Sequence, residues 1–374
     1  MNAFIEVHAI QSLPPSNINR DDTGAPKSAV YGGVNRARVS SQSWKRATRE
    51  AFEQSMSPDQ VSYRTKRIIR LLTDRIMATS DLDQTQAVTR ATAVAKEAGI
   101  TIKAPRVKDG QEPDPASFEA DALVFVSGQQ LGALAALGAA EGEIDKKAAK
   151  AAVNSQHGIA ISLFGRMVAA EPTLNVDAAT QVAHAISTHA VDPEGDFYTA
   201  VDDAKRAAGD TDAGAGMMGT IEFSSSTLYR YGAVSLTQLS ENLGDLQVTA
   251  AAVATFVESF LTSVPSGKKN TMAADTLPSA VIVSIRDTRP VSLVGAFERP
   301  VPAGDEGFVA PSIRRMADQA RHVSETYGLA PTTSWVITDP GHSDLLNGLG
   351  TRVTLPELSA QVHDAVVSVL QEDS

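Results

Sequence analysis

The first residues alternate between apolar and polar side chains, a pattern typical of a strand with one buried face. Within residues 3–10, the apolar side chains of Ile5, Val7 and Ala9 occupy every second position. After a long polar loop, the run SQSWKRATREAFEQ places apolar and basic side chains on opposite sides at helical spacing. The pattern therefore predicts a strand, a loop, and a helix that is capped by Ser40 or Ser41.

The middle of the chain reads differently. Residues 58–152 are rich in alanine and other helix-forming residues, with one polar loop at 104–116. This composition predicts a helical insertion rather than the core of a sheet. The segment DAATQVAHAISTHA, at 177–190, also has helical spacing and predicts a further helix.

The second half returns to strand patterns. The run TIEFSSSTLYRYGAVSL alternates and predicts two short strands, and SAVIVSIR, at 279–286, predicts a buried strand. Amphipathic helices are predicted at 246–264 and 311–327. Strand, helix, strand, strand, helix, strand is the order of a ferredoxin-like, or RRM-like, sheet. The predicted fold class is therefore α+β, with large insertions.

Composition narrows the possible functions. The 374 residues are 43% hydrophobic and include no cysteine, which excludes disulfides, thiol chemistry and cysteine-ligated zinc, and which fits a reducing compartment. The N-terminus begins as a strand without a signal-peptide pattern. No stretch approaches the ~18 apolar residues of a membrane helix. We expect a soluble, cytoplasmic protein with no membrane partner.

The net charge of −11 argues at first against nucleic-acid binding, but the charges are unevenly distributed. Between Ser16 and Arg75 there are twelve Lys and Arg residues and six Asp and Glu residues, a balance of +6 that leaves −17 for the remainder. Such asymmetry is typical of a localised anion-binding surface on an acidic protein. Chance clustering of solvated charges is the alternative.

The sequence contains only poor matches to motifs for cofactor binding, metal binding or catalysis. GAGMMG, at 214–219, matches G-x-G-x-x-G, but a polar loop precedes it and a strand pattern follows, so a dinucleotide site is not expected. The histidines form no metal motif; His8 is expected to point outward from the first strand. Asp21 and Asp22 could hold a divalent metal for phosphodiester cleavage. A turn that hydrogen-bonds its own backbone is the favoured interpretation. No cofactor or metal is expected.

The basic set is more informative. Cations and neutral hydrogen-bond donors occur together on a loop and on the start of a helix, where backbone N–H groups also favour phosphate. These residues are Arg20, Lys27, Arg38, Ser40, Gln42, Lys45, Arg46 and Arg49. Sequence-independent binding of a nucleic-acid backbone needs such donors and no base-reading groups.

Several ordered blocks resemble a known family. Asn19–Ala47 reads NRDD-(x4)-K-(x3)-YGG-(x2)-R-x-R-x-SSQSWKRA, with Ile18 where the family would have Leu. Further blocks are ISLFGRM at 161–167, STHAVDPEGDFYTAVDD at 187–203, GTIEFSSSTLYRY at 219–231 and GFVAPSI at 307–313. Together they resemble the Cascade backbone subunit of type I-E CRISPR systems, the CasC family of the RAMP superfamily. Residues 56–155 match no part of it closely.

The resemblance implies a hand-shaped subunit: an RRM-like palm, a helical fingers insertion and a protruding thumb. The implied boundaries are palm at 1–55, 156–186 and 221–374, fingers at 56–155, and thumb at 187–220. Copies would stack head-to-tail into a helical filament along the CRISPR RNA (crRNA). Other implied partners are the large, small, crRNA-capping and crRNA-processing subunits of Cascade, and the target DNA strand paired to the guide.

The resemblance also implies specific RNA contacts. The palm contacts would be Asn19, Arg20, Lys27, Ser40, Gln42, Lys45 and Arg49. Met167, with Phe197 or Tyr198 at the thumb tip, would form a wedge that kinks the guide, although Met167 could instead be a core residue. Lys268 and Lys269 are weaker candidates for RNA contact. The expected function is antiviral defence by a non-catalytic RNA-binding protein; the alternative is a metal-dependent RAMP-type nuclease that uses Asp21 or Asp22.

Overall fold

A computed structural model describes residues 3–372, except 55, 58–59, 105–113, 169–171, 201–202, 204–206 and 208–216. The chain forms two compact units, each built from several segments. The first unit comprises Met1–Ala51, Gln181–Ala233 and Ala254–Ala365. The second comprises Phe52–Thr180, Val234–Val253 and Val366–Ser374. No helix in the described ranges is both long and apolar enough to cross a membrane.

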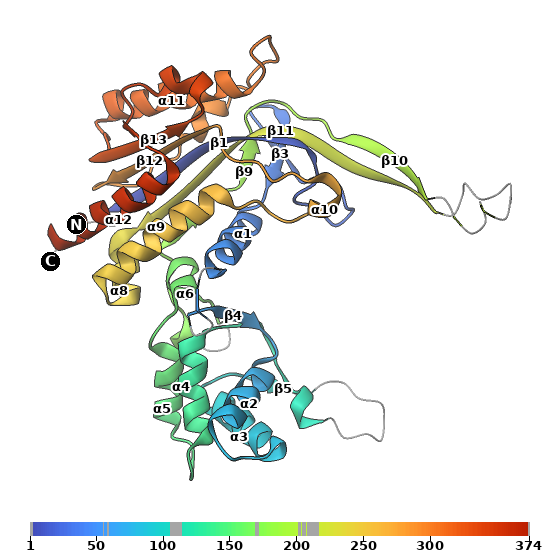
Figure 1. The fold of residues 1–374 in the computed structure, drawn as a ribbon, viewed down its shortest axis with the longest axis vertical. Coiled ribbons are helices and arrows are strands. Elements are labelled where there is room, and N and C mark those ends of the chain that lie inside the picture. Colours follow the sequence, from blue (N-terminus) through green and yellow to red (C-terminus); the bar gives the residue numbers. More distant parts are fainter. Residues whose placement is uncertain are drawn as a thin grey trace. The chain divides into compact units, whose positions relative to one another are not determined.

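The first unit is built on a large sheet whose centre has the ferredoxin-like arrangement. Its strands include β1 (Phe4–Ser16), β9 (Ala185–Ser187), β11 (Met217–Ser235) and β12 (Ala280–Arg286). They lie side by side in the order β12-β1-β11-β9 (Figure 1), which is the 4-1-3-2 order of a βαββαβ fold. The α+β palm predicted from the sequence is therefore confirmed.

Further strands extend this sheet at both edges. On the β12 side lie β13 (Thr333–Thr338) and β14 (Thr351–Arg352); on the β9 side lie β3 (Val34–Val39) and β2 (Ser28–Tyr31). The short strand β8 (Thr180–Val182) pairs with β11. Because β3 pairs with β9 through Val39 and Ala185, the end of β3 lies beside the segment that precedes β9.

Helices cover both faces of the sheet. Helix α11 (Val309–Tyr327) packs through Ile313 and Met316 on the face that carries Ile10 and Ile282. The opposite face carries Arg230, whose guanidinium lies 3.7 Å from the ring centroid of Trp44, in α1 (Ser41–Glu53), and 4.6 Å from that of Phe260, in α9 (Leu246–Thr262). On this face Trp335 also donates to Gln361 of α12 (Leu355–Glu372), at 2.8 Å.

Three sequence-based predictions of local structure are wrong. Strand β1 is buried on both faces, so His8, 1% exposed, does not point to solvent. Residues 177–190 contain strands β8 and β9 instead of a helix. Their helical spacing of alanines is overridden by sheet pairing, as in the contacts of β9 with β3 and β11. Strand β11 is one continuous strand rather than two short ones.

The first part of β11 extends into a hairpin with β10 (Glu194–Ala200). This hairpin lies within the segment expected to form the thumb. Its pairing sets Phe197 opposite Thr220 and Tyr198 opposite Gly219. Because neighbouring residues of a strand point to opposite faces, Phe197 and Tyr198 lie on different faces of the hairpin. In Figure 1 the two strands run together away from the sheet.

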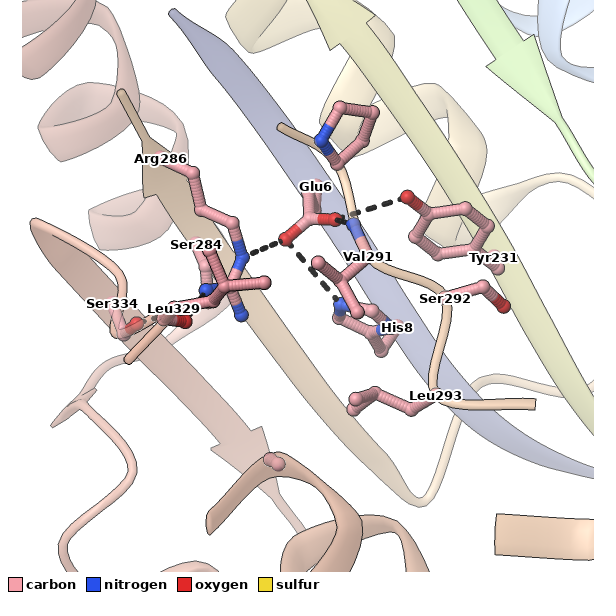
Figure 2. Close-up of polar contacts among 12 residues, drawn as sticks. Glu6, His8, Tyr231, Ser284, Arg286, Val291, Ser292, Leu293, Leu329 and Ser334 are labelled. Atoms are coloured by element: carbon pink, nitrogen blue, oxygen red, sulfur yellow. Dashed lines mark hydrogen bonds and ion pairs between the residues drawn. The ribbon is translucent and has the colours of Figure 1, made fainter. Parts of the chain in front are cut away.

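A charged cluster is buried between the sheet and the segment after β12 (Figure 2). The carboxylate of Glu6, on β1, forms an ion pair with Arg286, accepts from Tyr231 Oη at 2.9 Å and accepts from the amide of Val291. Burial, and then Glu6, raise the pKa of Tyr231. Burial, and then the charge of Arg286, lower the pKa of His8 to about 3. We call Glu6, His8, Tyr231 and Arg286 the buried cluster.

The second unit is mainly helical, as its alanine-rich sequence predicts. Its described helices between Phe52 and Thr180 are α2 (Ile68–Thr79), α3 (Gln84–Glu97), α4 (Gly128–Ala139), α5 (Lys146–Asn154) and α6 (Ile159–Phe164). Two small strand pairs were not predicted: β4 (Ser62–Thr65) with β7 (Val124–Ser127), and β5 (Ile102–Lys103) with β6 (Glu119–Ala120). The predicted loop at 104–116 falls largely outside the described residues. Helix α8 (Leu236–Leu243) also belongs to this unit.

Candidate nucleic-acid interface

The start of helix α1 is held by side chains from distant parts of the chain. Asn19 Oδ1 accepts a hydrogen bond from the amide of Ser40 at 2.8 Å, and His184 Nδ1 accepts one from the amide of Ser41 at 3.1 Å. The hydroxyl of Ser40 accepts from the amide of Ser43 at 3.3 Å, so Ser40 caps the helix as one of the two predicted serines. These bonds fix the first turn of α1 beside the loop that contains Asn19.

A small apolar core lies beneath these elements. Its buried members come from β1, β3, α1, β9, β11 and two loops: Leu13, Ile18, Val39, Trp44, Ala185, Leu228 and Ala274. Trp44 is 1% exposed, and the neighbouring positions Lys45 and Arg46 lie toward the surface. One core thus fixes several polar segments along one side of the first unit.

Lys27 and Arg38 lie together on this surface. The amide of Arg38 donates to the carbonyl of Lys27 at 2.9 Å, and the amide of Lys27 donates to that of Asn19 at 3.0 Å. The Arg38 side chain contacts Ser28 O at 3.3 Å and His184 Nδ1 at 3.5 Å. Burial lowers the pKa of His184, and the charges of Arg38 and Lys27 lower it further. Both cations therefore lie close enough to act on the same imidazole ring. Arg20 is exposed on the same loop.

The basic residues of α1 differ in their partners. Lys45 is partly buried, and this burial lowers the pKa of its ammonium group. Within the described ranges, no ion pair involves Lys45. Arg46 instead forms an ion pair with Glu50, one turn along the helix, at 2.7 Å. Lys45 and Arg49 follow Ser41 at intervals of four, so they continue along the same stripe of the helix. Gln42 is exposed beside them.

We call Arg20, Lys27, Arg38, Lys45 and Arg49, with Asn19, Gln42 and His184, the cationic surface. It contains most of the palm residues predicted from the sequence, and the histidine was missed. No sequence motif indicates a role for His184, because the pairing of β9 with β3 is what brings this residue to the surface beside α1. Ser40 lies at the edge of this surface, but its side chain is buried.

Other arginines of the basic segment serve the fold. Arg36, 0% exposed, donates to the carbonyl oxygens of Ser187 and Phe297, both at 2.9 Å. Burial, the largest effect, lowers the pKa of Arg36. The sequence alone could not separate this structural arginine from the surface cations, because Arg36 and Arg38 alternate to the same face of β3 and differ only in how far the rest of the fold covers them.

The loop of Lys268 and Lys269 packs near the cationic surface. A Cβ added at Gly267 would meet the carbonyl oxygen of Ile18 at 2.4 Å, so this glycine brings the loop against the residue before Asn19. Lys268 has a left-handed backbone conformation, with φ of 50°. Lys269, at the start of α10 (Lys269–Met272), forms an ion pair with Asp275 at 2.7 Å. Lys268 is therefore the better placed of the two for an external anion.

The acidic pair forms a turn, as favoured from the sequence. Asp21 Oδ1 accepts from the amide of Thr23 at 2.9 Å, from its hydroxyl at 2.7 Å and from the amide of Ala25 at 3.0 Å. These bonds, led by the Thr23 hydroxyl, lower the pKa of Asp21. Among the residues that the structure describes, no group of three potential metal ligands occurs.

The three apolar candidates have different environments. Met167 is 82% exposed, which excludes the interpretation as a core methionine. Phe197 is 64% exposed on the hairpin. Tyr198 is only partly exposed, and its ring covers Gly219, where an added Cβ would lie 2.6 Å from Tyr198 Oη. Met218, diagonal to Phe197 across the hairpin, is 62% exposed, so Phe197 and Met218 form an apolar face.

Fold and site together define a class of protein: a ferredoxin-like palm with a helical insertion, an extended hairpin and a cationic surface that suits a phosphate backbone. The chain belongs to the CT1975-like protein family, which matches residues 5–361. A search of curated protein sequences found no match.

Solved structures extend this comparison. A chain of a "CRISPR RNA-guided surveillance complex, pre-nicking" is 34% identical, with a TM-score of 0.82, and the match covers 97% of this chain and 100% of that one. A chain of a "CRISPR RNA-guided surveillance complex" is 30% identical, with a TM-score of 0.72 and coverages of 97% and 99%. The protein is thus similar, over nearly its whole length, to chains of CRISPR RNA-guided surveillance complexes.

Proposed function

We propose that this protein is the crRNA-binding backbone subunit of a type I-E Cascade complex. The cationic surface carries the proposal: Lys27 and Arg38 meet at His184, Lys45 lies one turn along α1 from Ser41, and no described carboxylate forms an ion pair with these three cations. A partly buried ammonium group without a counter-ion is costly unless an anion completes the site. The near-complete match to chains of surveillance complexes makes guide RNA the anion of choice.

Recognition of this kind concerns the backbone. The surface offers cations and neutral donors, which suit phosphate oxygens and leave the bases free to pair. The sequence of the target is then read by pairing between the guide and a DNA strand. Head-to-tail contacts between copies form an interface that does not close, so the subunits build a helical filament on the RNA. The other Cascade subunits would bind at its ends and along it.

The hairpin has a proposed role in this filament. Phe197 and Met218 form an exposed apolar face, and Met167 is exposed in the second unit. An exposed aromatic side chain can stack on a base or separate two neighbouring bases. We propose Phe197, rather than Tyr198, as the aromatic part of the wedge, because the Tyr198 ring already packs on Gly219.

We further propose that the subunit is cytoplasmic and non-catalytic. The observation that supports the second point is local: Asp21 spends three hydrogen bonds on its own turn, which leaves it poorly suited to hold a metal. The assembled complex, incubated with complementary RNA and Mg²⁺, should give no regular cleavage products. Products at regular spacing that vanish in the Asp22→Asn variant would support the nuclease instead.

The deciding experiment is co-expression with the neighbouring Cascade subunits and a CRISPR array, followed by purification at high salt. We expect RNA of one defined length to remain with the complex. The double variant Lys45→Glu, Arg49→Glu should be soluble but should fail to retain RNA, because it reverses two charges along α1. A complex that assembles without RNA, or a double variant that retains it fully, would contradict the proposal.

A further inference from the structure

His184 lies in the short connection between β8 and β9, and its exposed side chain meets the start of α1. Its Nδ1 atom is 3.1 Å from the amide nitrogen of Ser41 and 3.5 Å from Nη1 of Arg38. Neither the sequence pattern nor the palm residues implied by resemblance include this histidine. Its contacts with the start of α1 and with Arg38 therefore require an explanation.

Geometry fixes the tautomer of this imidazole. A backbone amide and a guanidinium group can only donate hydrogen bonds, so Nδ1, which faces both, must accept. In the neutral ring the proton is then on Nε2. Protonation of Nδ1 would set an N–H group against two other donors. The charged groups acting on the ring, Arg38 from β3 and Lys27 from the loop before β2, are both cationic and also favour the neutral form.

Nε2–H is the unused side of the ring. Within the described part of the chain, Nε2 of His184 forms no hydrogen bond, and the imidazole is exposed. A phosphate that reaches Arg38 and Lys27 would come to the same surface. We propose that His184 is an additional RNA-contacting residue, whose Nε2–H donates a hydrogen bond to a phosphate oxygen held by Arg38 and Lys27. This inference rests on the proposed RNA-binding function.

A neutral donor differs measurably from a cation. Each cation that neutralises a phosphate of single-stranded RNA releases counter-ions and adds about 0.7 to the log–log dependence of affinity on salt. A neutral imidazole contributes affinity without this release. Its removal should therefore weaken binding equally at low and high salt, whereas removal of Lys27 should also flatten the salt dependence.

The test uses the full chain and a fluorescein-labelled single-stranded oligouridylate, with affinity measured by anisotropy at several salt concentrations. His184→Asn retains an acceptor near the position of Nδ1 and removes Nε2–H. We expect its Kd to rise about 10- to 150-fold, the range for one hydrogen bond to a charged acceptor. Its salt slope and melting temperature should stay unchanged. His184→Gln, which keeps a donor near Nε2 and loses the acceptor for Ser41, should bind RNA nearly as well as wild type.

The outcomes separate two kinds of failure. If Lys27→Ala and Lys45→Ala weaken binding while His184→Asn does not, the histidine contact is wrong and the proposed function stands. Weakening by His184→Gln but not by His184→Asn would show that His184 only holds the start of α1 through Nδ1, which also overturns the inference. If none of these variants weakens binding, the proposed function itself is wrong.

Discussion

The first unit contains two clusters of charge that are arranged in opposite ways. In the buried cluster, Arg286 faces Glu6, and the remaining oxygen of that carboxylate is used by Tyr231 and Val291. On the cationic surface, Lys45 and Lys27 have no ion pair with any carboxylate that the structure describes. Buried charges must be satisfied within the fold, whereas surface charges can wait for a ligand. Closed clusters therefore indicate stability, and open ones indicate binding.

Opening the buried cluster should have the largest effect. Glu6→Gln would leave Arg286 buried without its counter-ion, and breaking one partner of a buried pair costs about 3–5 kcal/mol. We expect the free energy of unfolding, measured with urea, to fall by about that amount. Glu50→Gln, which removes the partner of exposed Arg46, is the matched control and should change stability by about 0.5 kcal/mol or less. Similar losses in both variants would contradict the comparison.

The converse experiment removes a cation from the cationic surface. Lys45→Ala removes a cation that lacks an ion pair, and hydrogen bonds to charged groups contribute about 1.5–3 kcal/mol. RNA affinity should therefore fall by about one to two orders of magnitude, with near-normal unfolding. Arg46→Ala, on the same helix, should have a much smaller effect, because Glu50 already neutralises Arg46. Equal losses of RNA affinity would show that pairing does not decide which cation binds RNA.

The sequence predicted much of this architecture where local pattern and tertiary structure agree. The strand at 279–286 and the helices at 246–264 and 311–327 correspond to β12, α9 and α11. It failed where sheet pairing overrides local spacing, as at 177–190. The excess of basic residues between Ser16 and Arg75 was also visible in the sequence. The sequence did not show which of these residues are buried in the fold and which lie at the surface. Arg36 is buried and Arg38 is at the surface, although the two are neighbours on one strand.

His184 shows why part of the site could not be predicted. It is separated from Ser41 by the whole helical insertion, and only the pairing of Val39 with Ala185 brings the two together. Likewise, the sequence predicted that Phe197 or Tyr198 forms the aromatic part of the wedge, and it could not choose between the two. Strand register alone distinguishes them, since it sets Tyr198 against Gly219.

The hairpin repeats the comparison on a smaller scale. The Tyr198 ring is used by the fold and the Phe197 ring is not. Phe197→Ala should leave the melting temperature unchanged and weaken RNA binding by about 1–3 kcal/mol per stacked base. The periodic nuclease or chemical reactivity of the bound guide should fade as well. Tyr198→Ala should instead destabilise the hairpin. An unchanged reactivity pattern in the Phe197 variant would show that the wedge lies elsewhere.

Lowering the pH should destabilise the buried cluster, because His8 becomes protonated. Tyr229 Oη accepts the amide proton of Leu293 at 2.8 Å and lies 2.9 Å from His8 Nδ1, so the imidazole is hydrogen-bonded within the fold. Burial favours the neutral form of this imidazole. Its pKa of about 3 lies below the value of about 6.5 in the unfolded chain. The unfolded state therefore binds more protons below pH 6.5, and stability is lost as the pH falls toward 3.

At pH 5.5 this effect of His8 should amount to about 1.4 kcal/mol relative to neutral pH. It is measured as the difference in the free energy of unfolding between pH 7.5 and pH 5.5. His8→Gln keeps a polar partner for Tyr229 and does not titrate, so its loss over the same interval should be smaller by about that amount. The other histidines are common to both proteins and cancel in the comparison. If both proteins lose the same stability, His8 is not held neutral by burial, and the cluster is less closed to protons than its geometry implies.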